Sequence, residues 1–452
     1  MPLYCKFQRP NQAPSSYMPV EWILRWMCAR NDKYVHLVAS DRMTVDIDDD
    51  RLLETFEEYS TIGATENNGL HRLALSNADK KVRDRFISDL EVLGLDVHID
   101  ELGNIFGRRE GIDSDAAPVL IGSHLDSQPN GGRFDGQLGV LTALETLHAF
   151  EDEDIGTERP IEIVNWTNEE GSRFEKAMLG SGSFAGAVDV DEALALTDAD
   201  GHTVEEELAR IGYDGNHSCE PRDLHAYLEL HIEQGPHLEE NDRSIGIVEG
   251  VVGESWMEAT VHGESDHAGP TPMHARCDAL VTATSAIKEI QTLPNRLSTD
   301  AVSTVGRMNV SPGSVNVVPD EVTFTIDVRS YDDNTVGQAV EATEFELDTA
   351  CKRTGASYEL ESLWSISSLE FSPMVRDQVE ANATSLDISY QHIVSGAGHD
   401  ASYINEVTDS GLVFVPSVDG KTHNEAEYTR SQDILNGARV YANTALALAN
   451  DV

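Results

Sequence analysis

The sequence predicts an α/β protein in which a smaller α+β domain interrupts the main domain. Apolar, strand-like runs alternate with amphipathic helical segments through most of the chain. This pattern changes between residues 250 and 362, and a length of 452 residues is enough for two hydrophobic cores. We therefore predict a catalytic domain of residues 43–249 and 363–452 and an inserted lid or dimerisation domain of residues 250–362.

The main domain is predicted to contain a largely parallel sheet, because its strands are separated by helices. Apolar residues at helical spacing predict helices over residues 48–60, 77–94 and 140–150. Short apolar or β-rich runs predict core strands over residues 119–123, 161–167, 227–233 and 411–417.

The inserted domain is predicted to have the order β-α-β-β-α-β, which is the ferredoxin-like arrangement of a small independent sandwich. Its strands are expected over residues 254–263, 301–310, 321–330 and 357–364, and its helices over residues 274–290 and 335–353.

The charge of the chain is strongly acidic, with 80 Asp and Glu against 32 Lys and Arg and a net of −48. Such a surface repels nucleic acid and anionic membranes, so we expect neither as a partner. Lysine is scarce, 8 against 24 Arg, and the acidic residues are dispersed. This pattern is typical of a halophilic protein, because concentrated salt screens the repulsion between carboxylates.

A cytoplasmic location is expected from two absences in the sequence. No run approaches the roughly 18 apolar residues of a membrane span, and the N-terminus lacks a signal-peptide pattern. The five cysteines are widely spaced, which indicates free thiols in a reducing compartment. They are Cys5, Cys28, Cys219, Cys277 and Cys351.

The first 42 residues differ in composition from the rest of the chain. They carry a net charge of +3, against −51 for the remainder, and hold two of the five Trp. We interpret residues 1–42 as an extension outside the fold, with Met43 as the natural start. The alternative is a basic arm with a binding role.

Six residues that could bind or serve metal ions lie at the ends of predicted strands or in a glycine-rich turn. The carboxyl ends of strands in an α/β sheet form its functional crevice, so these residues are expected to converge. A lone His beside a strand is more often structural, and a Glu-Glu pair is usually solvated, but the whole set is harder to dismiss. The six are His124, Asp135, Glu169, Glu170, His231 and His423.

Three imidazoles with two carboxylates and no thiolate suit Zn, Mn, Co or Ni. Five ligands are too many for one tetrahedral catalytic ion, but they suffice for two ions if Asp135 bridges them. Asp126 is expected to accept the other ring N–H of His124. Glu169 would remain free to move the proton of an attacking water.

The order of several motifs resembles the hydantoinase/carbamoylase family of amidases, within the aminoacylase-type metallopeptidase clan. That family includes N-carbamoyl-L-amino acid hydrolases, allantoate amidohydrolases and β-ureidopropionases. The resemblance covers roughly residues 48–447. The motifs are GSHLDSQ, GGRFDG, TNEEGSRF, LELHIEQG, SDHAGPTPM, VNVVP, VDVRS, GAGHDA and KTHNEAEYT.

The resemblance implies a di-metal aminopeptidase-like catalytic domain with a ferredoxin-like lid, and a homodimer formed through the inserted domain. It implies two divalent ions per subunit, Zn or Mn and possibly Co or Ni, with Glu169 as general base. One ion would bind His124, Asp135 and His231, and the other Asp135, Glu170 and His423.

The same resemblance implies roles for residues that touch the substrate. His267 would stabilise the oxyanion, often across a dimer, Asn316 and Arg329 would hold the substrate carboxylate, and Gln234 would line the pocket. The turn that would close over the carboxylate is Gly396, Ala397, Gly398 and His399. The sequence departs from the family pattern at Lys421-Thr422, just before His423, where relatives often carry a small residue or Ser. This difference affects the expected local shape of the pocket.

These observations predict a metal-dependent amidohydrolase acting on an N-carbamoyl amino acid or allantoate. An aminoacylase or dipeptidase of the same clan is the nearest rival, disfavoured by His231 and the GAGHD turn. A non-catalytic metal-binding scaffold is the rival from another class. Glu169 argues against it, because a scaffold needs no base beside its ligands.

Overall fold

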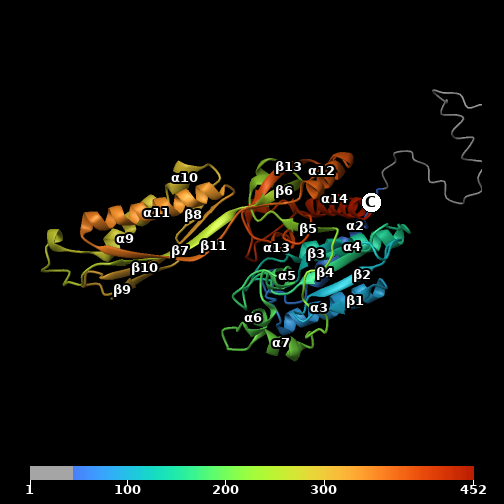
Figure 1. Ribbon diagram of the computed structural model, residues 1–452, viewed down its shortest axis with the longest axis horizontal. Helices are drawn as coiled ribbons and strands as arrows, with labels where there is room; N and C mark the ends of the chain where they lie inside the picture. The colour runs from blue at the N-terminus through green and yellow to red at the C-terminus, as the bar shows by residue number, and fades with distance from the viewer. Residues whose placement is uncertain (1–43, 452) are drawn as a thin grey trace, which may run out of the picture. The chain divides into compact units, whose positions relative to one another are not determined.

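The computed structural model describes residues 44–451, which contain two separate sheets, each with its own helices (Figure 1). The predicted extension over residues 1–42 lies outside the described residues. Among the described helices, none is both long enough and apolar enough to span a membrane.

The first sheet has nine strands, and its four central neighbours run parallel in the order β4-β3-β5-β14. The flanking strands β1, β2 and β12 pair antiparallel to their neighbours, as does β6 with β14, while β13 lies parallel to β6. The strands are β1 (Asp96–Ile99), β2 (Ile105–Arg109), β3 (Val119–His124), β4 (Ile161–Trp166), β5 (Ala226–Ile232), β6 (Ile245–Val251), β12 (Leu369–Glu370), β13 (Tyr390–Ser395) and β14 (Ser410–Val415).

The prediction of core strands along this sheet is confirmed at all four positions, because β3, β4, β5 and β14 overlap them. Every residue of these four strands is buried, which explains why they are mainly apolar. The outer strands β1, β2, β6 and β13 were not predicted, since they are only partly apolar or interrupted by glycine.

Helices surround the first sheet and share one continuous hydrophobic core with it. The helix α2 begins after Asp48, whose side chain accepts the Arg51 backbone N–H at 3.0 Å. The helices are α2 (Asp49–Ser60), α3 (Asn77–Val92), α4 (Gln137–Asp152), α5 (Leu179–Phe184), α6 (Val190–Ala195), α7 (Val204–Ile211), α8 (His237–Glu240), α12 (Pro373–Ser385), α13 (Asp400–Ile404) and α14 (Ser431–Ala449).

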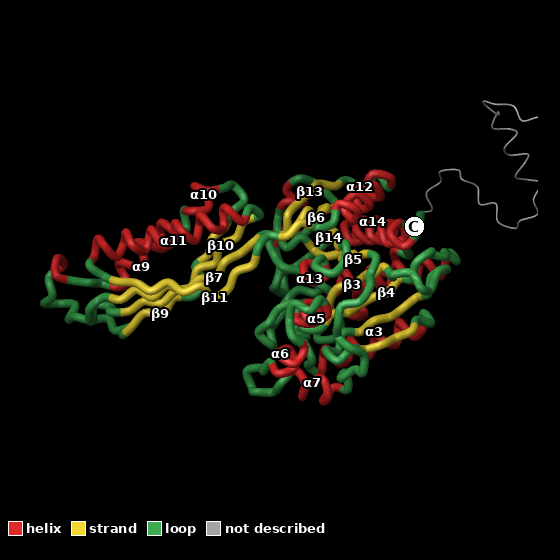
Figure 2. Tube along the Cα trace, in the orientation of Figure 1, coloured by secondary structure: helices red, strands yellow, loops and turns green. Residues whose placement is uncertain are grey.

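The second sheet is antiparallel, with its helices on one face and the other face free of helices (Figure 2). Its central pair β7 and β10 alternates buried and part-exposed residues, as expected for a one-sided sheet. A second hydrophobic core lies between this sheet and the helices. The elements are β7 (Gly253–His262), α9 (Ala279–Ile290), α10 (Leu293–Leu297), β8 (Val302–Thr304), β9 (Met308–Ser311), β10 (Glu321–Ser330), α11 (Asp333–Thr354) and β11 (Ser357–Ile366).

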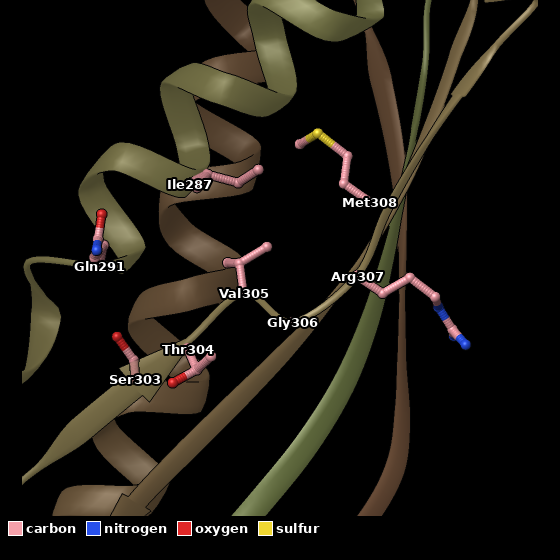
Figure 3. A pocket seen from close by; sticks show the side chains of 8 residues that line it. All are labelled: Ile287, Gln291, Ser303, Thr304, Val305, Gly306, Arg307 and Met308. Carbon is pink, nitrogen blue, oxygen red and sulfur yellow. The ribbon is translucent and has the colours of Figure 1, made fainter. Parts of the chain in front are cut away.

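The single strand expected over residues 301–310 is wrong, because the chain forms two short strands, β8 and β9, with a break at residues 305–307. Both strands pair with β10, and in the gap Thr325 binds Arg307 through backbone and side-chain hydrogen bonds of 3.1 Å. A groove of about 480 Å³ lies at the break, where the Arg307 side chain points away from Ile287 and Met308 (Figure 3). No Asp, Glu or His lines this groove.

Candidate metal centre and substrate pocket

The five predicted metal ligands meet at the carboxyl end of the parallel strands. His124 ends β3, His231 lies in β5, and Glu170 follows β4 after a short turn. Asp135 precedes α4, and His423 lies in the loop after β14. Because β4, β3, β5 and β14 are neighbours, their ends bring ligands from five chain segments into one site.

Asp135 lies at the centre of these ligands. Its Oδ1 is 3.0 Å from His231 Nε2 and 3.5 Å from His124 Nε2, and its Oδ2 is 3.4 Å from His423 Nε2. Glu170 Oε2 is 3.6 Å from the same nitrogen of His423. The residues thus form two groups, His124-Asp135-His231 and Asp135-Glu170-His423, that share one carboxylate.

The hydrogen bonds of two histidines fit a metal role. His124 Nδ1 lies 3.1 Å from the Asp126 carbonyl oxygen, and His231 Nδ1 lies 3.0 Å from the Ile232 carbonyl oxygen. A carbonyl can only accept, so each Nδ1 carries a proton, and Nε2, which lies toward Asp135, is the ring nitrogen left to bind a cation. His124 Nε2 is buried and has no hydrogen-bond partner. Rings oriented in this way beside a buried carboxylate fit a metal-binding role, and the donor set suits a divalent cation.

The pKa values also indicate a dry site with excess negative charge. Burial, with Asp135 next to it, raises the pKa of Glu170 to about 8. The hydrogen bond to Asp135 raises the pKa of His423 to about 9. Burial opposes ionisation of Asp135, but His231 and the other ring donors outweigh it and hold the Asp135 pKa well below its usual range. Bound cations would supply the positive charge that these groups otherwise obtain from protons.

Glu169 lies beside the two groups without belonging to either. Its Oε2 is 3.5 Å from His124 Nε2, and the residue faces the pocket although only 8% of its surface is exposed. Burial, which outweighs the charge of His124, raises the Glu169 pKa well above its usual range. A carboxylate with a raised proton affinity beside a metal centre is suited to accept and return a proton.

Asp126 acts through different atoms from those we expected. Its backbone carbonyl, not its carboxylate, is the close partner of His124 Nδ1, because the carboxylate oxygen is 3.7 Å away. The carboxylate instead accepts the backbone N–H groups of Glu169 and Glu170 at 3.2 and 3.3 Å. Asp126 therefore orients the ring of His124 and also fixes the backbone of Glu169 and Glu170.

Glu427 and Thr422 support the shared carboxylate; Glu427 was not singled out from the sequence, and Thr422 was noted only as a departure from relatives. Glu427 accepts the backbone N–H groups of Phe134 and Asp135 at 2.9 and 3.2 Å. Thr422 Oγ1 is 3.3 Å from Asp135 Oδ2 and 3.2 Å from Glu427 Oε2. Thr422, the residue that departs from relatives, thus donates its hydroxyl group to Asp135. In the sequence, only the KTHNEAEYT motif pointed to Thr422 and Glu427.

Two glycines make room for this arrangement. Gly136 has φ +62°, and a Cβ there would lie 2.3 Å from the His124 ring. A Cβ at Gly132 would lie 1.9 Å from a Glu427 carboxylate oxygen. Side chains at either position would displace the residues that position Asp135.

A pocket of about 770 Å³ opens from the metal ligands toward the free face of the second sheet. Gln234 lines it and donates from Nε2 to Asp135 Oδ2 at 2.7 Å. Ala397, Gly398 and His399 also line it. Burial and the neighbouring His231 lower the His399 pKa well below its usual range, so this ring is neutral.

Arg329 lies in the same pocket on strand β10. Its Nη1 donates to the Gly396 carbonyl at 3.0 Å, its Nη2 pairs with Asp327 at 2.9 Å, and its Nε lies 3.0 Å from Glu254. A guanidinium has five N–H groups, so one on each terminal nitrogen remains for a ligand. Two such donors match the two oxygens of a carboxylate.

His267 and Asn316 do not line this pocket. They lie together in the segments that follow β7 and β9. There the Ala268 N–H donates to the Asn316 carbonyl at 2.9 Å, and His267 forms an isolated antiparallel β-bridge with Val317. Both residues are exposed. Within one chain, the structure therefore does not bring these two predicted residues to the metal ligands.

Comparison with known proteins identifies the family. Residues 120–447 match the model of peptidase family M20/M25/M40. An N-carbamoyl-L-amino-acid amidohydrolase of Rhizobium meliloti is 40% identical, with 89% of this chain and 97% of the relative covered. An allantoate amidohydrolase of Escherichia coli is 33% identical, with 86% and 95% covered.

Solved structures agree with this result. A hydantoinase/carbamoylase family amidase from Burkholderia multivorans is 43% identical and superimposes with a TM-score of 0.86, covering 90% of this chain and 98% of its own. The chain belongs to peptidase family M20/M25/M40. The predicted family resemblance and the predicted fold class are confirmed.

Proposed function

We propose that this protein hydrolyses a C–N bond of an N-carbamoyl amino acid or a related ureido acid such as allantoate. The observation that carries the proposal is one pocket in which two ligand groups share Asp135, with Glu169 and Arg329 facing the same space. The predicted enzyme class, an amidohydrolase of non-peptide C–N bonds, is confirmed by the relatives that carry this activity in their names. The substrate itself is part of the proposal.

The residues of the site support separate roles for the metal ions and for Glu169 in the reaction. Divalent ions held by the two ligand groups would activate a water molecule and polarise the substrate carbonyl. Glu169 accepts the proton of the attacking water and delivers it to the terminal nitrogen as the C–N bond breaks. Ammonia leaves, and the remaining carbamate loses carbon dioxide to release the amino acid.

Substrate binding is assigned to the other side of the pocket. The two free donors of Arg329 bind the substrate carboxylate, and the Gly396–His399 turn closes over it. Gln234 lines the pocket beside Asp135, to which its Nε2 donates, and would contact the substrate there. A cation is needed here because the remainder of the pocket is rich in carboxylates.

His267 and Asn316 complete the proposal only if a second copy of the chain supplies them. Both are exposed on the inserted domain, which supports a homodimer formed through that domain. His267 of the second copy would then stabilise the oxyanion, and its Asn316 would contact the substrate carboxylate. Zn or Mn as the bound metal and a cytoplasmic location are further parts of this proposal.

One hydrolysis screen tests the proposed substrate class. Ammonia release would be measured with N-carbamoyl-L-amino acids and allantoate, in molar salt with added Mn. N-acetyl amino acids and dipeptides would be scored by release of the free amino acid. We expect turnover of ureido acids and none of dipeptides. Preferred hydrolysis of N-acetyl amino acids or dipeptides would instead establish the aminoacylase or dipeptidase alternative.

A further inference from the structure

Three large apolar side chains lie uncovered on the second sheet. Trp256, Leu363 and Trp364 are 43%, 47% and 39% exposed. All three line the pocket that also contains Asp135 and Glu169. We call these three residues the indole surface. Exposed apolar groups that gather in a pocket mark a place where a ligand is bound.

The strands explain how this surface forms. Trp256 of β7 and Trp364 of β11 are direct cross-strand partners, and their rings lie 5.3 Å apart at 58°. The register shifts between Ser362 and Trp364, so Leu363 is an extra residue in β11. A bulge of this kind re-aims side chains, and here Leu363 and Trp364 both line the pocket.

The indole surface adjoins the proposed carboxylate site. On strand β7, Glu254 and Trp256 are two residues apart on the same face, and Arg329 and Asp327 of β10 are their respective cross-strand partners. A substrate whose carboxylate binds Arg329 and whose ureido group reaches Asp135 therefore has its side chain near the two indoles. The negative charge of Glu254 in this region is paired with Arg329, whose Nε lies 3.0 Å from Glu254 Oε2.

The chemistry of this surface discriminates between the two substrate classes of the proposed function. An apolar or aromatic side chain gains contact area and ring packing against the indoles. The second ureido group of allantoate would place N–H and C=O groups against apolar rings without partners, which is unfavourable.

We propose that the indole surface is the side-chain subsite of the enzyme and selects N-carbamoyl amino acids with large apolar side chains. This inference rests on the proposed function and narrows it to one substrate class. Trp256 and Trp364 are its specificity-determining residues, with Leu363 at its edge.

The test compares substrates that differ only in the side chain. In the wild-type protein, kcat/KM for N-carbamoyl-L-phenylalanine is expected to exceed that for N-carbamoyl-L-alanine by about tenfold or more, and allantoate is expected to be poorer still. In Trp364→Ala the phenylalanine-to-alanine ratio should fall by about tenfold, and Trp256→Ala should lower it in the same direction. Trp364→Phe should retain most of it.

The matched control is Glu361→Ala, an exposed residue of the same strand outside the pocket. It should leave the ratio unchanged. Light scattering on each variant separates a binding effect from loss of assembly. If the tryptophan variants lose kcat/KM equally with every substrate, with or without a change of oligomeric state, the proposed subsite is wrong. It is also wrong if the wild-type enzyme shows no preference for apolar side chains. Failure to hydrolyse any ureido acid would refute the proposed function itself.

Discussion

The two sheets of this protein present functional groups in different ways. In the first sheet the central strands are buried on both faces, so metal ligands stand only at or beyond the strand ends, as His124 and Glu170 do. In the second sheet one face is free of helices, so side chains such as Trp256 and Arg329 lie on that face and line the pocket. The proposed metal ligands and the proposed side-chain subsite therefore lie on different sheets.

This difference predicts separable defects. Strand ends in a rigid, doubly covered sheet hold ligands to the narrow tolerance that a metal pair needs. A one-sided sheet has its own core and can change its free face at little cost to folding. Four experiments test this contrast.

The largest effect is expected from Asp135→Ala. Because Asp135 lies between both ligand groups, the variant should lose both metals and essentially all activity. Glu169→Gln should keep the metals and lose about 10²- to 10⁴-fold in turnover, since only a proton-transfer group is removed. Metal analysis by mass spectrometry beside kcat distinguishes the two variants, and full metal loading in Asp135→Ala would contradict the bridging role.

The next effect concerns the second core alone. Phe324 is fully buried in β10, and Phe324→Ala should destabilise the inserted domain by about 3–5 kcal/mol. Hydrogen exchange should show lost protection over residues 253–366 while β3 and β5 stay protected. Thr323→Ala, on the free face of the same strand, is the control and should cost about 1 kcal/mol or less. Equal loss of protection in both sheets would show that the two cores unfold as one.

The structure of each sheet could be predicted from the sequence only where local sequence patterns determine it. The buried strands β3, β4, β5 and β14 are mainly apolar, and the convergence of the predicted ligands at their ends followed from sheet geometry. The break between β8 and β9 could not be predicted, because Val305-Gly306-Arg307 is compatible with a continuous strand. It depends on how Thr325 of the neighbouring strand bonds Arg307.

In the candidate site, too, the features that depend on tertiary contacts could not be predicted from the sequence. Spacing placed Asp126 beside His124, but whether its carbonyl or its carboxylate contacts the ring is decided by the loop that follows β4. Glu427 supports Asp135 from a segment 292 positions away, which no local pattern can reveal. The Trp256-Trp364 pair depends on strand register and on the Leu363 bulge, both of them tertiary features.

A graded effect is expected when salt is withdrawn. With a net charge of −48, repulsion extends over about 30 Å at 0.01 M salt but only about 3 Å near 1 M. A dimer would suffer first, because association brings two acidic subunits together. Activity should therefore fall at potassium chloride concentrations where circular dichroism is unchanged. Full activity at 10 mM salt would contradict the halophilic interpretation, and simultaneous loss of both signals would argue against a site shared between subunits.

The smallest effect is expected from removing residues 1–42. Because their composition differs from that of the rest of the chain, a protein that starts at Met43 should keep its activity and its melting temperature. Thermal melts of both forms at equal salt provide the measurement. A drop of several degrees would show that this segment packs on one of the two sheets.

The position of β14 between β5 and β6 has a consequence for synthesis on the ribosome. Strand β5 is wholly buried in the finished protein, yet its partner β14 begins about 180 residues later. Because synthesis proceeds at roughly 5–20 residues per second, one edge of β5 stays unpaired for on the order of 10–40 s before β14 is made. During this interval the inserted domain, whose strands and helices are contiguous in sequence, can fold first. An unpaired strand edge invites aggregation, so we expect the nascent chain to be most prone to aggregate before residue 415 emerges.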